Sequence, residues 1–249
     1  MLLALTGLFV VHRLVSAQQL EPANVVAGSI YMPLSGLFGI LIAFTAFLVW
    51  QQYNSASETA EREASLLAAI YWHAEGFPES ERHHVQDLAR SYAQVVKEEE
   101  WSLMGEGKES FKAWAIVDEL RRSIDGYEPS TSTEQTLHAQ QVTLVDDVLN
   151  ERKFRLLKSR EGIPPILWVV LLSGTPVILG FSYLFGVKNL RVHMVMVAML
   201  TVVIVGVLFS IKAIEYPFTG DVRVPPSAFE LILNRFEADS NKSALRSTV

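Results

Sequence analysis

The sequence has no cysteine, which excludes disulfide bonds, thiol nucleophiles and thiolate metal sites. A glycine-rich phosphate loop is missing, and so are the GxSxG and HExxH motifs of hydrolases and zinc proteases. Charged residues make up only 19% of the chain and the formal net charge is −6, so no basic surface for nucleic acid is expected. We therefore predict a protein that is not an enzyme, uses no cofactor and has no nucleic-acid partner.

Metal ligands are not clustered in the sequence. His83 and His84 are adjacent, so on a helix they point about 100° apart and do not share a metal as an i, i+4 pair does. Glu98, Glu99 and Glu100 form the densest acidic run. Three successive helical positions fan around the axis, and we interpret this run as a solvated face rather than a cation site. The sequence predicts no metal site.

Ionisable residues are also absent from the apolar run between Gly28 and Trp50, which contains no Asp, Glu, Lys, Arg or His. Ionisable groups inside a membrane usually mark ion relays and coupled-transport sites. Their absence disfavours a proton-coupled transporter or pump. Any transport along this segment is therefore predicted to be passive.

Apolar blocks at the two ends of the chain flank one polar block, which is typical of a membrane protein with a soluble insert. We predict an all-α membrane protein with four transmembrane helices and a cytoplasmic α-helical bundle between the second and third spans. The predicted domains are transmembrane helices 1 and 2 in residues 1–53, the bundle in residues 54–162, transmembrane helices 3 and 4 in residues 163–215, and a cytoplasmic C-terminal tail with a short amphipathic helix in residues 216–249.

The first apolar segment is short for a span. About sixteen helical residues reach only ~24 Å, whereas the hydrocarbon core of a bilayer is about 30 Å thick. The stretch from Val15 to Ala17 resembles a signal-peptidase site, but the charged leader of a signal peptide is missing. Two interpretations stay open, a cleaved signal and a retained span, and we favour the retained span.

Lys and Arg residues near the ends of the spans predict the orientation. Eight lie on the side of the bundle and the C-terminal tail, namely Arg62, Arg152, Lys153, Arg155, Lys158, Arg160, Lys212 and Arg223. Three lie on the other side, namely Arg13, Lys188 and Arg191. The bundle and both termini are therefore predicted to be cytoplasmic.

One long helix, from Gly28 to about Ala74, is predicted to leave the membrane and continue into the bundle. No Gly or Pro interrupts this stretch after Gly39. Ser35, Gly39 and Ala43 follow one another at helical spacing, and a stripe of small residues lets another helix approach closely.

Three phenylalanines of this helix are candidate pore-lining residues, namely Phe38, Phe44 and Phe47. A ring of such side chains in an oligomer forms a hydrophobic constriction that can gate by dewetting. The alternative is that each phenylalanine packs against a neighbouring span or faces lipid.

Several stretches resemble a bacterial membrane family with a bestrophin-like domain, whose function is not settled. They are Trp50 to Tyr53, Glu63 to Leu67 with Tyr71, Gly162 to Trp168, Phe185 to Leu190 and Tyr216 to Val224. The last stretch is the most specific of them. The residues that carry the resemblance most clearly are Glu63, Tyr71, Pro164, Pro165, Gly186, Asn189, Pro217, Phe218 and Gly220.

The resemblance implies a similarity to bestrophins, which are oligomeric anion channels with four spans and a cytoplasmic helical region. In bestrophins one helix lines the pore, carries an aromatic-rich neck and continues into the cytoplasm. Phe38, Phe44 and Phe47 are six and three positions apart, unlike the even spacing of that neck. The acidic calcium clasp of bestrophins is not recognisable either, and both departures weaken the transfer of chloride selectivity and of calcium control to this chain.

We therefore predict a homo-oligomeric, passive ion channel of a bacterial inner membrane that conducts small ions, anions in preference to cations. Its second span would line the pore, and the lipid bilayer would be its surroundings. The alternative is a non-conducting membrane anchor or assembly protein whose cytoplasmic bundle docks a partner protein. The oligomeric state in mild detergent separates the two, because a pore requires a ring of several copies.

Overall fold

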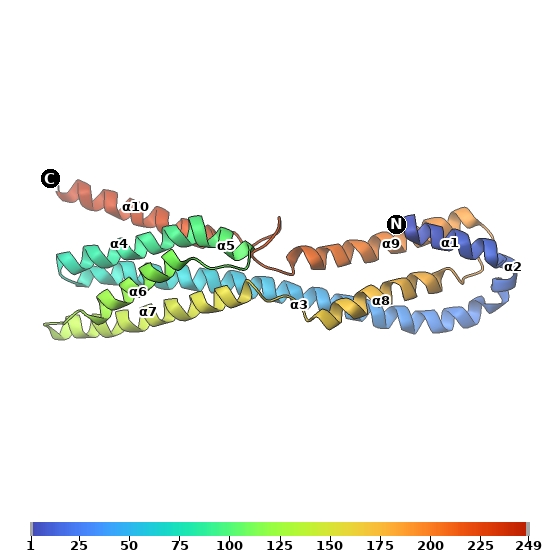
Figure 1. Ribbon diagram of the computed structural model, residues 1–249, viewed down its shortest axis with the longest axis horizontal. Helices are drawn as coiled ribbons and strands as arrows, with labels where there is room; N and C mark the ends of the chain where they lie inside the picture. The colour runs from blue at the N-terminus through green and yellow to red at the C-terminus, as the bar shows by residue number, and fades with distance from the viewer. Residues whose placement is uncertain (1, 248–249) are drawn as a thin grey trace. The chain divides into compact units, whose positions relative to one another are not determined.

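The computed structural model describes residues 2–247, and these residues form helices and loops without a β-strand (Figure 1). The elements are α1 Leu2–Leu14, α2 Ala17–Leu20, η1 Glu21–Ala23, α3 Asn24–His73, η2 Ala74–Gly76, α4 Glu79–Val95, η3 Val96–Glu100, α5 Trp101–Gly105, α6 Phe111–Asp125, α7 Ser132–Lys158, α8 Pro165–Ser182, α9 Leu190–Ile214 and α10 Ser227–Ser247. The prediction of an all-α fold is confirmed for this part of the chain. The outer ends of the first and last predicted domains, and with them both termini, fall on residues 1, 248 and 249 and lie outside the described residues.

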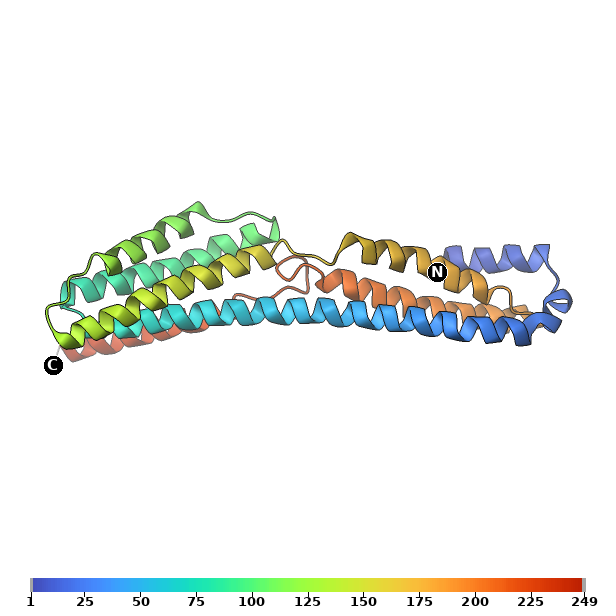
Figure 2. The same cartoon turned by 90° about the horizontal axis from the view of Figure 1, so that it is seen from below.

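The long helix α3 contains 50 residues and is uninterrupted, as Figure 2 shows. It begins at Asn24, a few residues before the predicted start, and Pro33 lies within it. It ends at His73, where η2 and the Gly76-Phe77-Pro78 turn follow. Proline cannot donate a backbone hydrogen bond and disfavours a helical residue before it, so the helix is not continued past Pro78.

The chain divides into two compact units. Unit 1 consists of Met1–Gln51 and Gly162–Glu215, and unit 2 consists of Gln52–Glu161 and Tyr216–Val249. Because α3 passes from one unit to the other, it contributes its N-terminal part to the core of unit 1 and its C-terminal part to the core of unit 2.

Unit 1 has an apolar core formed by α1, α3, α8 and α9. Figure 2 shows α1 beside α8 and α9. Close approach depends on glycine, because a Cβ on Gly7 of α1 would meet the Tyr183 ring at 2.9 Å. The buried apolar residues are Ala4, Leu8, Phe38, Ile42, Val49, Ile163, Leu171, Ile178, Leu179, Val197, Ile204 and Ile211.

Three helices are long and apolar enough to cross a membrane in the part of the chain that the structure describes. They are the helical run Ala17–Gly76, which contains α3, together with α8 and α9. The apolar helix α1 is shorter, with 13 residues, or about 20 Å. A protein with membrane-crossing helices is therefore supported, whereas α1 as a fourth span stays a prediction.

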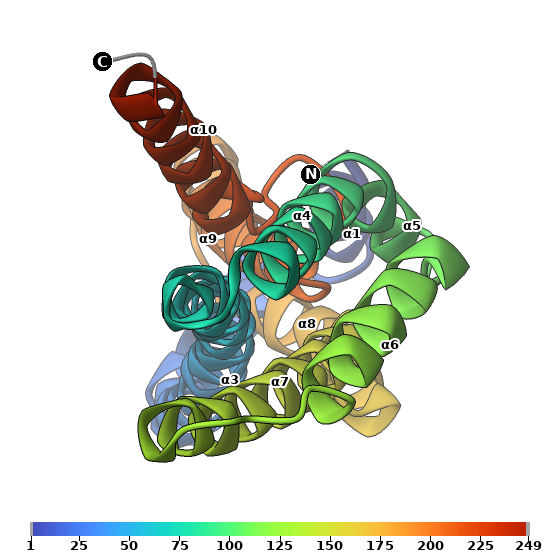
Figure 3. The ribbon, with the colours of Figure 1, turned by 90° about the vertical axis from the view of Figure 1, so that its left-hand side faces the viewer.

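Unit 2 is a helical bundle built from α4, α6, α7, α10 and the rest of α3. Figure 3 looks toward the ends of these helices and shows α6 between α4 and α7. The helix α6 begins after Ser110, whose hydroxyl accepts a hydrogen bond from the Ala113 backbone N–H. The helix α7 begins after Thr131, whose hydroxyl accepts one from Glu134 N–H. Both side chains satisfy amide groups that have no partner within the helix.

The C-terminal helix α10 is longer than the short amphipathic helix that the sequence predicts. It continues to Ser247, although the sequence becomes polar after Glu237. Two hydrogen bonds hold this polar part on the bundle: the Trp72 indole N–H donates to Asp239, and Arg90 donates to the Ser240 hydroxyl. The sequence predicted only a short helix because these partners come from distant parts of the chain.

The turn between α8 and α9 is fastened to the start of α3. Gly186 N–H donates to the Asn24 side-chain oxygen at 2.8 Å, and the Asn24 amide donates back to the Gly186 carbonyl at 3.3 Å. A Cβ on Gly186 would overlap backbone atoms of Ala17 and Glu21, so the backbone itself would have to shift to accommodate it. The Asn189 side chain then caps α9 by accepting from the N–H groups of Arg191 and Val192 in the first turn of that helix.

We expect Gly186→Ala to destabilise the protein by about 1–3 kcal/mol, the usual cost of overpacking. Gly180→Ala is the control, because a Cβ at that position of α8 meets no atom within 4 Å. In a helix, Ala is favoured over Gly by about 0.5–1 kcal/mol, so the control should be neutral or stabilising. Thermal unfolding of both variants in detergent measures the difference. Equal melting temperatures would contradict the tight fit at residue 186.

Candidate functional site

The part of α3 in unit 1 has one buried face. Phe38, Ile42, Thr45 and Val49 follow each other at helical spacing and are buried in the core of unit 1. Phe38 packs against α8, where a Cβ on Gly174 would meet its ring at 2.5 Å. Of the three candidate pore residues, Phe38 is therefore held inside its own chain.

The opposite face of the same helix segment is exposed within the single chain. Phe44 and Phe47 are 56% and 57% exposed, and Ile40 on the same side is 68% exposed. At about 100° per residue, Phe47 points roughly 180° away from Phe38. The structure therefore separates the three phenylalanines, and Phe44 and Phe47 are the ones available to line a pore in an assembly.

Two residues of the predicted small-residue stripe, Gly39 and Ala43, lie open on the surface of the single chain. A Cβ on Gly39 would meet no atom of another element within 4 Å, and Ala43 is exposed. The hydroxyl of Ser35 donates to the Met32 carbonyl of its own helix. The approach of a second helix to this stripe stays a prediction, and the second helix would have to come from another copy.

The core of unit 2 contains two carboxylates and two guanidinium groups, all fully buried. Arg155 of α7 donates to both carboxylate oxygens of Glu63 in α3, at 2.6 and 2.9 Å. It also reaches Glu100 at 3.5 Å, and Arg152 donates to Glu100 at 2.8 Å. The Tyr92 hydroxyl donates to Glu63 at 2.6 Å. We call Glu63, Glu100, Arg152 and Arg155 the buried ionic quartet.

The quartet is balanced in charge and enclosed by aromatic rings. Arg152 lies 4.1 Å from the centre of the Trp114 ring, and Arg155 lies 5.4 Å from that of Trp101. Burial by itself lowers the pKa of Arg155, but the Glu63 and Glu100 carboxylates raise it above its ordinary value. Burial, followed by the charge of Glu63, raises the pKa of Tyr92 well above its usual range. Arg155 therefore stays charged and Tyr92 stays neutral, and the paired, fully buried side chains act as a structural element of the core.

Two sequence-based interpretations are wrong at the quartet. Glu100 does not belong to a solvated acidic face: Glu98 and Glu99 are exposed, but the π-helical turn η3 directs Glu100 into the core. Arg152 and Arg155 are not cations at a membrane surface, because both side chains are fully buried. The sequence did carry a signal, since the buried face of α7 follows one helical spacing, namely Gln141, Val145, Val148, Arg152, Arg155 and Leu156.

The residues that carry the family resemblance occupy defined structural positions. Tyr71 stacks on Phe236 with ring centres 4.0 Å apart, and Phe218 packs edge-on against Trp101 at 5.4 Å. Pro164 and Pro165 start α8. Pro217 accepts a hydrogen bond from Val224 N–H at 2.7 Å, and Gly220, with φ of +76°, makes the intervening turn. With Glu63, Gly186 and Asn189 placed as above, these residues build the fold, and no chemical role follows from their positions.

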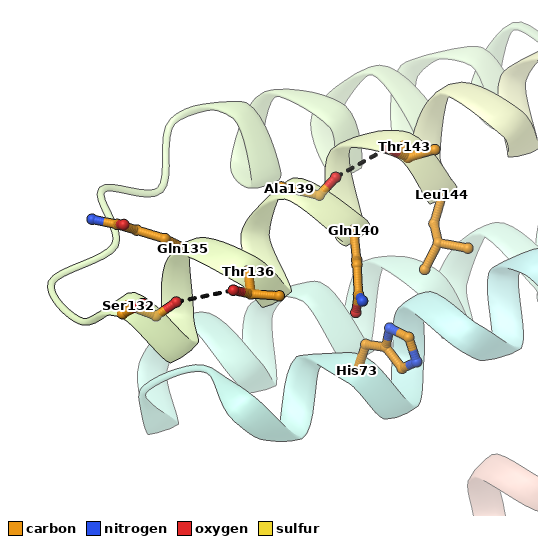
Figure 4. Close-up of a pocket in the computed structure, with 8 residues that line it drawn as sticks. All are labelled: His73, Ser132, Gln135, Thr136, Ala139, Gln140, Thr143 and Leu144. Atoms are coloured by element: carbon orange, nitrogen blue, oxygen red, sulfur yellow. Dashed lines mark hydrogen bonds between the residues drawn. The ribbon is translucent and has the colours of Figure 1, made fainter.

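The surface of unit 2 carries an open groove between the end of α3 and the start of α7. Figure 4 shows His73 facing the side chains of α7, among them Thr136 and Gln140. The groove has a volume of about 730 Å³, and its hydroxyls at Thr136 and Thr143 donate to carbonyls of their own helix. Within residues 2–247 no group of three His, Asp or Glu side chains is placed to hold a metal ion. This groove therefore offers no arrangement of catalytic groups.

The fold has been seen before. Two crystal structures of a bacterial Bestrophin homolog from Klebsiella pneumoniae match it with TM-scores of 0.70 and 0.69, one of them carrying a point mutation. The sequence identities are 10% and 11%, and each match covers 94% of this chain and 95% of the other. The family model of the bestrophin-like domain matches residues 1–229. No curated protein matches this sequence.

The apolar helices of unit 1 and the helical bundle of unit 2 thus define an all-α membrane protein with the bestrophin fold. The chain belongs to the bestrophin-like family. This family is channel-like rather than enzymatic, which agrees with the absence of catalytic motifs from the sequence.

We expect Arg155→Met to lower the free energy of unfolding by about 3–5 kcal/mol, because it leaves the Glu63 carboxylate buried without its partner. The control is Arg121→Met, which removes a half-exposed guanidinium paired with Asp125 and Asp146. Exposed pairs are worth about 0–1 kcal/mol. Urea unfolding followed by tryptophan fluorescence measures both, with Trp101 beside Arg155 as a local reporter. Equal losses in the two variants would show that the quartet contributes no more than a surface pair.

Proposed function

We propose that the protein is a homo-oligomeric, passive ion channel whose α3 helix lines the pore. The observation that carries this proposal is the exposed, uncharged face of α3 in unit 1. That face contains Ile40, Phe44 and Phe47, each more than half exposed in the single chain. Membership of the bestrophin-like family supports the same conclusion.

Passive conduction follows from the chemistry of α3. Its unit 1 part has no Asp, Glu, Lys, Arg or His, the side chains that usually bind and release protons or ions during coupled transport. Apolar rings control ion flow by wetting and dewetting instead. Phe44 and Phe47 are the side chains that would form such rings.

The proposal also specifies the charge of the conducted ion, with anions preferred to cations. The preference for anions rests on the resemblance to bestrophins alone. In unit 2, a second groove between α3 and α7, separate from the groove beside His73, is acidic and opposes this preference. Its charged residues are Glu58, Glu61, Asp147 and Glu151, against Arg62. A channel that places this groove along the ion path would attract cations, so the reversal potential is the decisive measurement.

Purified full-length protein in planar bilayers should conduct, and under asymmetric KCl its reversal potential should lie toward that of chloride. A reversal potential toward potassium would contradict the anion preference but keep the channel. Absence of conductance above protein-free bilayers, together with a monomeric protein, would contradict the channel itself. The protein would then fit a non-conducting membrane anchor.

Phe47→Ala should raise the conductance or the open fraction several-fold, because it widens and wets an apolar constriction. The matched control is Phe209→Ala on α9, since Phe209 is also exposed in the single chain, at 73%. The control should conduct as the unchanged protein does. An identical change in conductance in the two variants would show that Phe47 does not line the pore.

Gly39→Leu should shift the oligomer toward smaller species, because a large side chain on the small-residue stripe keeps a second copy at a distance. Gly206→Leu on α9 is the control, because this glycine also meets no atom of another element. Light scattering coupled to size exclusion in mild detergent measures the mass. An unchanged mass for Gly39→Leu would place the contact between copies elsewhere on α3.

A further inference from the structure

Unit 1 contains a pocket that the proposed channel does not use. Its volume is about 390 Å³, and it lies among the first turns of α3, the α8–α9 turn and the first turns of α9. Most of its wall is apolar, with Phe185, Met196, Val197 and Leu200 among the lining residues. A pocket of this size with a mainly apolar wall and a few polar groups is typical of a small-molecule site.

The polar groups of this pocket lie at one end. Asn24 and His193 sit in the first turns of α3 and α9, and the Asn24–Gly186 hydrogen bonds hold both helices at the α8–α9 turn. Leu200 lies two turns further along α9, in the apolar part of the span. The pocket is therefore polar near the helix ends and apolar toward the middle of the span.

His193 is a fixed and nearly fully buried part of the pocket, with 4% exposure. Its Nε2 lies 3.0 Å from the Ser182 carbonyl, which only accepts, so Nε2 carries the proton and donates. The neutral ring then presents Nδ1 as an acceptor. Among the described residues, neither this Nδ1 nor the hydroxyl of Tyr31 has a hydrogen-bond partner, and both residues line the pocket.

The walls of the pocket are rigid. Tyr31 stacks on Phe181 at 5.4 Å and meets Phe185 edge-on at 5.5 Å. The Asn24 side chain is bonded to the Gly186 backbone in both directions. A site whose side chains are already held in place loses little entropy when a ligand enters.

We propose that this pocket binds the acyl chain of an amphiphile, with the ester or carboxyl end at Tyr31 and Asn24 and the tail along Met196 and Leu200. The direction of the pocket matches that of a membrane lipid, whose polar end lies at the helix ends and whose chain runs toward the bilayer centre. The Tyr31 hydroxyl and the second amide hydrogen of Asn24 are donors for a carbonyl oxygen. Lys188 in the turn pairs with Glu21 at 3.0 Å, and Arg191 in the first turn of α9 is exposed.

The test uses the full-length protein in vesicles of phosphatidylethanolamine and phosphatidylglycerol, followed by mild extraction and native mass spectrometry. We expect one retained lipid per chain. Met196→Trp fills the pocket and should lower the retained fraction about tenfold. Met199→Trp is the matched control, because Met199 is a similarly exposed methionine of α9 that does not line the pocket. It should retain lipid as the unchanged protein does.

Tyr31→Phe keeps the ring contacts and removes only the hydroxyl, so it should lower retention several-fold. The retained mass identifies the source of the chain, because a phospholipid and a free fatty acid differ in mass and both fit the proposal. Bound detergent alone, equal loss in the two methionine variants, or full retention by Tyr31→Phe would overturn it. Since binding is measured without conductance, this outcome is independent of the channel proposal.

Discussion

The buried ion pair between Glu63 and Arg155 is the constraint on which unit 2 depends. Two charges without water are tolerated only when each keeps a partner of opposite sign with good geometry. The pair joins α3 to α7, and through Glu100 and Tyr92 it also joins η3 and α4. The contact therefore fixes both the rotation and the register of these helices, whereas apolar contacts tolerate small slips.

The same helix α3 meets two different requirements. Within unit 1 its buried face is apolar and its exposed face is uncharged, and within unit 2 its buried face is rich in alanine and carries one carboxylate. Alanine allows close packing of helices, and close packing excludes water. The buried carboxylate of Glu63 therefore needs a partner of opposite charge within the protein. The exposed face of the unit 1 part is apolar and open in the single chain, so it is the surface that assembly of several copies would cover.

The course of the helices could be predicted from the sequence, because it depends on local signals. Gly76 and Pro78 end α3, Thr131 starts α7 and Pro165 starts α8, and the all-α fold follows from them. The buried quartet was missed because Arg152 and Arg155 were counted as surface cations. Only the spacing of α7 and a partner some ninety residues away, at Glu63, place them in the core. The separation of Phe38 from Phe44 and Phe47 likewise depends on where α8 packs, which local sequence does not encode.

The pair of hydrogen bonds between Asn24 and Gly186 joins residues 162 positions apart in the chain. Contacts between such distant positions form late in folding, because the entropy of closing a long loop is lost before the contact contributes any stabilising free energy. During synthesis the Asn24–Gly186 hydrogen bonds at the N-terminal end of α3 can therefore form only after the α8–α9 turn has been made. A chain that stops before Gly186 would keep the packing of α8 against α1 and α3 but would lack both hydrogen bonds that fasten Asn24.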